Sequence, residues 1–100
     1  MSTLFTIAKS WHNASWVYEQ MAFASKGDAI ILIEDAVLSL HSPITLASFF
    51  AKCEMFDIRV YALTDDCAIR GISNQLEGVI TVDYAGFVEL VAQHQKQVAW

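Results

Sequence analysis

The sequence predicts one α/β domain in which helices cover both faces of a mainly parallel sheet of four to five strands, a three-layer α/β/α arrangement. Short β-branched or aromatic runs alternate along the 100 residues with segments of helical periodicity, and this alternation is typical of parallel α/β sheets. The four glycines and the single proline are scattered rather than clustered, so no linker is indicated. We therefore expect residues 1–100 to form one domain.

Four runs are expected to form the central strands. They are Thr3–Ile7, Asp28–Ile33, Arg59–Leu63 and Val79–Val82. The second run is apolar beyond its first residue, as expected of a parallel strand that is buried on both faces. The tail Gln97–Trp100 is either a further short strand at the edge of the sheet or a frayed terminus.

Helical periodicity predicts four helices between these strands. Apolar residues at i, i+4 and i+7 indicate a first helix over roughly Ser15–Ser25, and Ser42-Pro43 is a start signal for a second. A short third helix is expected to begin in Asp65-Asp66 and to stop at Gly71. A fourth is expected after Tyr84.

Composition limits the classes of protein and of partner. The chain carries eleven acidic and six basic residues, a formal net charge of −5, and 55% of its residues are hydrophobic. This apolar share excludes intrinsic disorder. A domain this short buries only about two-thirds of the surface of its unfolded chain, so part of the apolar surface is expected to face a partner. Six dispersed cations do not form a phosphate-binding surface, and direct nucleic-acid binding is not expected.

The distribution of apolar residues also argues against a membrane span and a secretory signal. The longest apolar run, Ala29–Ile33, lies between Asp28 and Glu34, whereas a membrane-spanning helix needs about 20 residues. No basic segment precedes the first apolar residues, and the first cation is Lys9. We expect a cytoplasmic protein without membrane contact.

The two cysteines are expected to be free thiols. Cys53 and Cys67 lack the spacing of a disulfide framework or a zinc site, and Cys53 falls on an apolar helical stripe that indicates a core position. Cys67 is expected in the first turn of the third helix, where the helix dipole lowers a thiol pKa. Asp65 and Asp66 oppose that effect. We favour an inert Cys67 and keep a persulfide-carrying Cys67 as the alternative.

Other catalytic machinery is hard to find. Glu34-Asp35 closes the second strand at its carboxyl end, where parallel sheets place their ligand crevices, but spacing fixes no further acidic or basic group beside it. We favour capping or interface hydrogen bonds for this pair. The sequence has no glycine-rich phosphate loop, and its three histidines match no metal motif. We expect no cofactor, no metal and no catalytic residue.

Large aromatic residues suggest an interface. Trp11 and Trp100 fall outside the periodic helix faces, and tryptophan is enriched among the residues that anchor protein interfaces. Some of the aromatic residues must nevertheless fill the core, and a terminal Trp100 folded onto its own sheet is the alternative. We expect the interface to contain five residues, which are Trp11, Glu34, Asp35, Tyr84 and Trp100.

Several short strings, in order along the whole chain, resemble one family of sulfur-relay subunits, called TusB in tRNA thiolation and DsrH in dissimilatory sulfur oxidation. The ending is the most specific part. The strings are Leu4 with Thr6 and Lys9-Ser10; Glu34-Asp35 after an apolar strand; Tyr61-Ala62-Leu63 followed by Asp65, Ala68, Arg70 and Gly71; and Val82-Asp83-Tyr84, Phe87-Val88 and Ala99-Trp100.

The resemblance implies a cytoplasmic subunit of a heterohexamer that contains two copies each of three homologous chains. Such complexes receive persulfide sulfur from a small carrier protein and pass it onward, in the tRNA pathway to the wobble uridine as a 2-thio group. The principal sulfur-carrying cysteine belongs to a TusD-like or DsrE-like sister chain. This chain is therefore expected to be a noncatalytic partner of TusC-like and TusD-like subunits.

Two departures from the family pattern matter. Some DsrH-type members carry a cysteine in the first helix, where this sequence aligns Gln20, and Cys67 does not match that family cysteine. Both points favour TusB over a subunit of sulfur oxidation. Relatives also commonly have glycine where this chain has Ala36, which puts the turn after Glu34-Asp35 in question.

The leading hypothesis is thus a noncatalytic subunit of a TusBCD-like complex. The alternatives are a sulfurtransferase that accepts persulfide on Cys67 and a DsrH-like subunit in sulfur oxidation. A third hypothesis is a homo-oligomeric protein that binds a small ligand at the Glu34-Asp35 edge.

Overall fold

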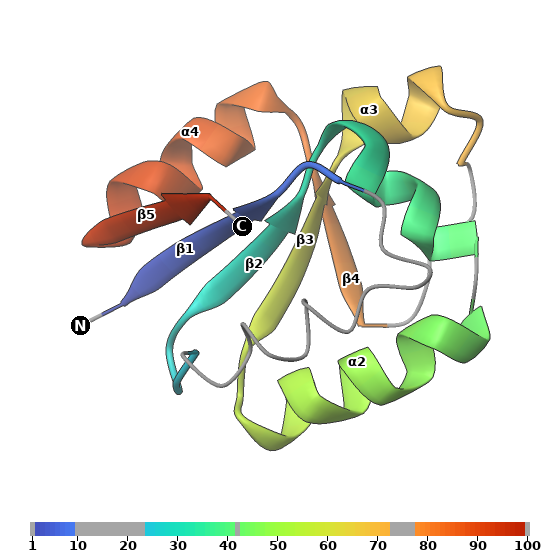
Figure 1. The fold of residues 1–100 in the computed structure, drawn as a ribbon. Helices are drawn as coiled ribbons and strands as arrows, with labels where there is room; N and C mark the ends of the chain where they lie inside the picture. The colour runs from blue at the N-terminus through green and yellow to red at the C-terminus, as the bar shows by residue number, and fades with distance from the viewer. Residues whose placement is uncertain (1, 10–23, 42, 73–77, 100) are drawn as a thin grey trace.

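A computed structural model describes residues 2–9, 24–41, 43–72 and 78–99, and within these ranges five strands form one parallel sheet (Figure 1). The predicted α/β sheet is confirmed. Its order is β4-β3-β2-β1-β5, and every neighbouring pair is parallel. The strands are β1 (Thr3–Ile7), β2 (Ala29–Leu32), β3 (Arg59–Leu63), β4 (Val79–Val82) and β5 (Lys96–Ala99).

The tail of the chain is an edge strand. β5 pairs with β1 along its whole length, which confirms the edge-strand alternative for residues 97–99. Trp100, like Trp11, lies outside the described residues.

The second strand is shorter than predicted. β2 begins at Ala29 because Asp28 closes a turn, in which its backbone N–H donates to the Ser25 carbonyl at 3.0 Å. The buried Asp28 carboxylate accepts hydrogen bonds from the Thr3 and Ser25 backbone N–H groups, both at 2.9 Å. These bonds fix the amino end of β1 to the turn that precedes β2.

Four helical segments lie between the described strands. They are η2, a 3-10 helix (Glu34–His41), α2 (Pro43–Met55), α3 (Thr64–Ile69) and α4 (Tyr84–Gln93). The second, third and fourth predicted helices are confirmed, whereas η2 was not predicted. Most of the predicted first helix falls outside the described residues. Its last two residues, Ala24 and Ser25, are not helical, so its predicted end was wrong.

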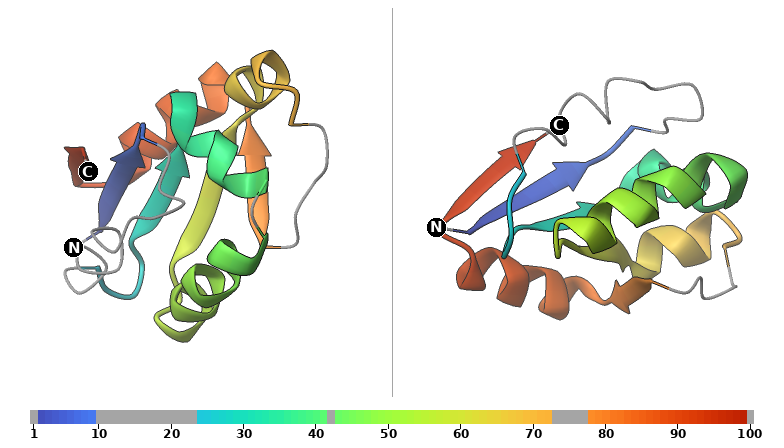
Figure 2. Two further views of the ribbon diagram at one scale, coloured as in Figure 1. Left: turned by 45° about the vertical axis from the view of Figure 1, so that its right-hand side comes forward. Right: turned by 90° about the horizontal axis from the view of Figure 1, so that it is seen from below.

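The helices make two outer layers around the sheet (Figure 2). Buried residues of η2, α2 and α3 pack on one face against β1, β2 and β3. Leu90 of α4 packs on the other face, against Leu4, Ala29 and Ile31. This division follows from the strand order, because β2–β3 and β3–β4 step in one direction and β4–β5 steps back across the sheet. Right-handed crossovers then place α4 opposite α2 and α3, and the predicted three-layer arrangement is confirmed.

Two helices end in the same hydrogen-bonded motif, with different residues at the critical position. At the end of α2, the Ile58 N–H donates to the Cys53 carbonyl at 2.8 Å and the Asp57 N–H to the Glu54 carbonyl at 3.2 Å. This is a Schellman cap with Asp57 in the left-handed region at φ 57°. α3 ends in the same pattern at Gly71, with φ 71°, as its predicted stop signal requires.

The described residues contain no helix that is long and apolar enough to cross a membrane.

We expect Asp57→Gly to raise the free energy of unfolding by about 0.5–1 kcal/mol, because glycine adopts a positive φ without the cost that a side chain adds. Urea denaturation of the purified chain measures the change. Gly71→Ala is the matched control with the opposite sign, a loss of about 1 kcal/mol. Destabilisation by Asp57→Gly would contradict this interpretation of the cap.

Candidate functional site at the carboxyl edge of the sheet

Four of the predicted site residues follow the carboxyl ends of neighbouring strands. Glu34 and Asp35 come after β2, Cys67 lies in α3 after β3, and Tyr84 begins α4 after β4. Because the sheet is parallel, these ends meet at one edge, where open α/β sheets place their ligand sites. The structure therefore brings together residues that are up to 50 positions apart in the sequence.

Two side chains, one in α3 and one at its C-cap, connect this helix to η2 at the carboxyl edge, and neither was predicted from the sequence as a site residue. Asp66 accepts a hydrogen bond from the Glu34 backbone N–H at 2.7 Å. Arg70 donates from Nε to Asp35 Oδ1 at 3.1 Å and from Nη1 to Asp66 Oδ1 at 3.5 Å. The i, i+4 spacing of Asp66 and Arg70 indicated their mutual contact, but nothing local indicated the contacts to η2. We call Asp35, Asp66 and Arg70 the Arg70 network.

The Arg70 network supports an unusual turn. Glu34 has φ 49°, a conformation that costs a residue with a side chain about 1–2 kcal/mol. The charge-assisted bond from its N–H to Asp66 offsets this cost. Ala36, where the family resemblance implied a glycine, is buried in η2 and does not have a positive φ. The positive φ lies two residues earlier, so alanine fits this turn.

The two acidic residues of the predicted pair differ in their surroundings from Asp66. Glu34 and Asp35 are both exposed, and the side chain of Asp35 is 65% accessible, compared with 16% for Asp66. An exposed ion pair such as Arg70–Asp35 contributes little to stability. The bond between Asp66 and the Glu34 backbone is therefore the contact that fixes the turn, and the side chains of Glu34 and Asp35 face solvent.

Both cysteines are free and buried. Cys53 is 3% exposed in the core, as predicted, and burial raises the pKa of its thiol to about 12. Cys67 is 6% exposed, and burial, followed by the negative charge of Asp66, raises its pKa above the ordinary value. Nucleophilic cysteines are accessible and have a lowered pKa. Neither thiol has these properties.

The remaining predicted site residues are the aromatic ones. Tyr84 is 66% exposed, and its ring meets Phe87 edge-on, with centroids 6.2 Å apart and planes at 89°. Val88, one turn further along α4, is also exposed. Trp11 and Trp100 lie outside the described residues. Within those residues, no three His, Cys, Asp or Glu side chains are grouped so that they could hold a metal ion.

Comparisons with known proteins identify the family. A family model described as DsrH like protein matches residues 10–97, which is most of the sequence. The chain belongs to the DsrH/TusB family of sulfur-relay subunits. Relatives named Protein TusB, from Shigella flexneri and Escherichia coli O139:H28, are 31% and 30% identical over 93 residues. Each match covers 89% of this chain and 95% of the relative. The resemblance inferred from short strings is confirmed.

Two solved structures share the fold of this DsrH/TusB chain. The YchN protein of E. coli superposes with a TM-score of 0.74 over 100% of both chains, at 13% sequence identity. Protein Tm0979 of Thermotoga maritima superposes with a TM-score of 0.61 over 90% of this chain and 92% of its own, at 21% identity. At these identities the likeness establishes the fold alone.

We expect Asp66→Ala to lower the free energy of unfolding by about 1–2 kcal/mol, because it leaves the Glu34 N–H in a strained turn without its charged acceptor. Asp35→Ala is the matched control, since it removes only an exposed ion pair, and is expected to cost less than about 0.5 kcal/mol. Urea denaturation compares the two. Equal losses would contradict the role assigned to Asp66.

Proposed function

We propose that this chain is a noncatalytic subunit of a TusBCD-like sulfur-relay complex, which transfers persulfide sulfur for 2-thiolation of the tRNA wobble uridine in the cytoplasm. One observation carries the proposal within this family. The sequence has two cysteines, and both are buried with raised thiol pKa values. A relay subunit without an accessible thiolate needs a sister chain to carry the sulfur.

The proposed partners are homologous TusC-like and TusD-like subunits in a heterohexamer. Small sulfur-carrier proteins are reached through that complex rather than by this chain alone. The formal charge of −5 supports protein partners over direct contact with tRNA, whose phosphates require a basic surface.

The carboxyl edge is the proposed contact surface for one sister chain. The exposed side chains of Glu34 and Asp35 stand on a turn that is hydrogen-bonded to the Arg70 network. Tyr84, which follows β4 two strands away, offers a large exposed ring at the same edge of the sheet. Rigid polar groups around an aromatic anchor are typical of protein interfaces. Trp11 and Trp100 complete the proposed interface set on the basis of sequence.

Coexpression tests the proposal. With TusC-like and TusD-like subunits from the same organism, the chain is expected to copurify as a stable complex of 2:2:2 stoichiometry, measured by light scattering after size exclusion. A chain that stays monomeric in the presence of both sister subunits would contradict the proposal. Assembly with DsrE-like and DsrF-like subunits instead would favour the role in sulfur oxidation.

Persulfide labelling tests where the sulfur travels. After incubation of the assembled complex with a persulfide donor, intact-mass spectrometry is expected to show an added sulfur of about 32 Da on the TusD-like chain and none on this chain, because the Cys67 thiol is buried and protonated. Cys67→Ser is the matched control and should leave transfer unchanged. Modification of Cys67 would instead support the sulfurtransferase alternative.

Substitution of the exposed ring tests the interface. Tyr84→Ala is expected to raise the dissociation constant of the complex about tenfold, because an anchoring aromatic side chain is lost. Met55→Ala removes a side chain of similar exposure at the other end of the sheet and should change the constant less than twofold. Isothermal titration calorimetry gives both values, and equal effects would remove Tyr84 from the interface.

A further inference from the structure

One face of the sheet is only partly covered by the described helices. In the row formed by Leu4, Ala29 and Arg59, the first two residues are buried beneath α4 and Arg59 is exposed. The next row continues from the buried Ile31 through the half-buried Tyr61 to Ile80, which is 48% exposed. Exposure therefore rises from β2 to β4. We call Arg59, Tyr61 and Ile80 the open face.

The open face has the width of one helix. Neighbouring strands lie about 4.8 Å apart and a helix with its side chains is about 10–12 Å wide, so one helix covers about two strands. α4 covers β1 and β2 through Leu90, and Tyr61 of β3 and Val82 of β4 pack at the margin of the same cluster. This leaves Arg59 and Ile80 as the exposed part of β3 and β4 on this face. Parallel sheets are usually covered on both faces. The strand order leaves space for a second helix beside α4.

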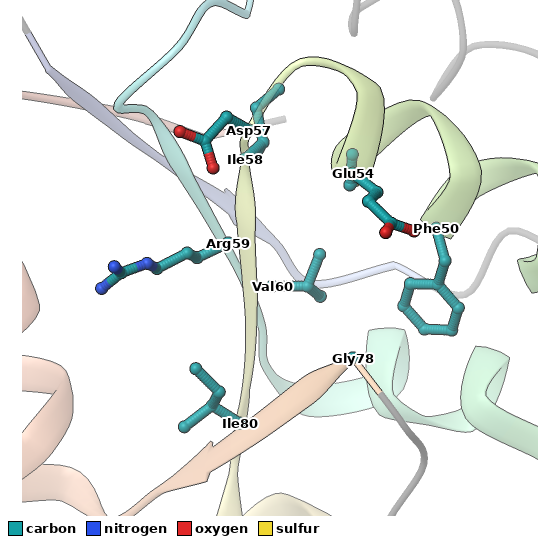
Figure 3. Close-up of a pocket in the computed structure, with 9 residues that line it drawn as sticks. Phe50, Glu54, Asp57, Ile58, Arg59, Val60, Gly78 and Ile80 are labelled. Atoms are coloured by element: carbon teal, nitrogen blue, oxygen red, sulfur yellow. The ribbon is translucent and has the colours of Figure 1, made fainter.

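Two hollows flank Arg59 at the amino end of β3. One of about 490 Å³ lies between Arg59 and Ile80 on the open face and Val60 on the opposite face, and Glu54 and Asp57 also line it. The other, of about 270 Å³, is lined by Arg59, Tyr61 and Gln93 together with Asp28 and Asp57. Figure 3 shows Arg59 and Ile80 on one side of β3, with Val60 and Phe50 on the other. The hollows flank the amino end of β3, at the opposite end of the strand from the Arg70 network.

Arg59 gives the open face a specific charge requirement. Its guanidinium has no hydrogen bond or ion pair with any residue that the structure describes, whereas Arg70 is bound by Asp35 and Asp66. A guanidinium is matched best by a carboxylate. The complement of the open face is therefore an apolar surface with a carboxylate at one end.

We propose that the open face receives a helix of a sister subunit, whose apolar side chains pack on Tyr61 and Ile80 and whose carboxylate binds Arg59. This inference rests on the proposed function and adds a second contact surface to it. A second copy of this chain fits less well. A twofold contact would set the same patch against itself, bringing Arg59 near its own copy, between two chains of net charge −5 each.

Ile80→Asp in the coexpressed complex tests the proposal. It is expected to raise the dissociation constant at least tenfold, because it places a charge in the apolar contact. The matched control is Thr81→Asp, which puts the same residue on the same strand at an exposed position of the opposite face and should change the constant less than twofold. Circular dichroism of each isolated variant checks folding.

Arg59→Glu provides a second test that leaves the apolar surface intact. Charge reversal at this exposed position is expected to weaken assembly at least tenfold at low ionic strength, whereas Lys96→Glu, the charge-matched control on β5, is expected to change it less than twofold.

The outcomes separate the two proposals. Failure of the wild-type chain to assemble with its sister subunits would overturn the proposed function and this inference with it. A normal wild-type complex that tolerates both Ile80→Asp and Arg59→Glu would overturn this inference alone. A dimer of the isolated chain that Ile80→Asp dissociates, measured by sedimentation velocity, would replace the sister helix with a second copy.

Discussion

The return of the last strand across the sheet is the constraint on which the rest of the molecule depends. β5 pairs with β1 at the edge opposite β4, so the crossover through α4 runs against the direction of the crossovers before it. With right-handed connections, this single reversal assigns η2, α2 and α3 to one face and α4 to the other. The two faces are consequently covered to different depths, and that difference decides which residues are chemically accessible.

The thiols are buried because both lie on the face of the sheet that η2, α2 and α3 cover. Cys53 of α2 and Cys67 of α3 both point into the cluster that these helices form with β1, β2 and β3. Burial is the leading cause of the raised pKa at each sulfur, because a low-dielectric environment disfavours the thiolate. The negative charge of Asp66 adds to this effect at Cys67. The topology thus leaves both sulfurs buried, with thiol pKa values above the ordinary value.

Local patterns predicted the strands and three of the helices, because burial on a strand or helix leaves a periodic signal in the sequence. The η2 segment was missed, since its buried Ala36, Val37 and Leu40 do not extend long enough to reveal a period and the stronger start signal lies after it, at Pro43. The positive φ of Glu34 has no sequence signal, because glutamate is not a residue that favours this region. Its partner Asp66 is 32 positions away and is brought there only by the packing of α3 beside η2.

The two surfaces left accessible by this arrangement lie at opposite ends of the strands. A five-residue strand spans about 16 Å, which separates Arg59 at the amino end of β3 from the turn at Glu34 beyond the carboxyl end of β2. Two separate contact surfaces allow one subunit to contact two neighbours of a hetero-oligomer at once. In the proposed complex this chain does so through the carboxyl edge and the open face. Loss of either surface should therefore yield a smaller complex with the remaining neighbour rather than a free monomer.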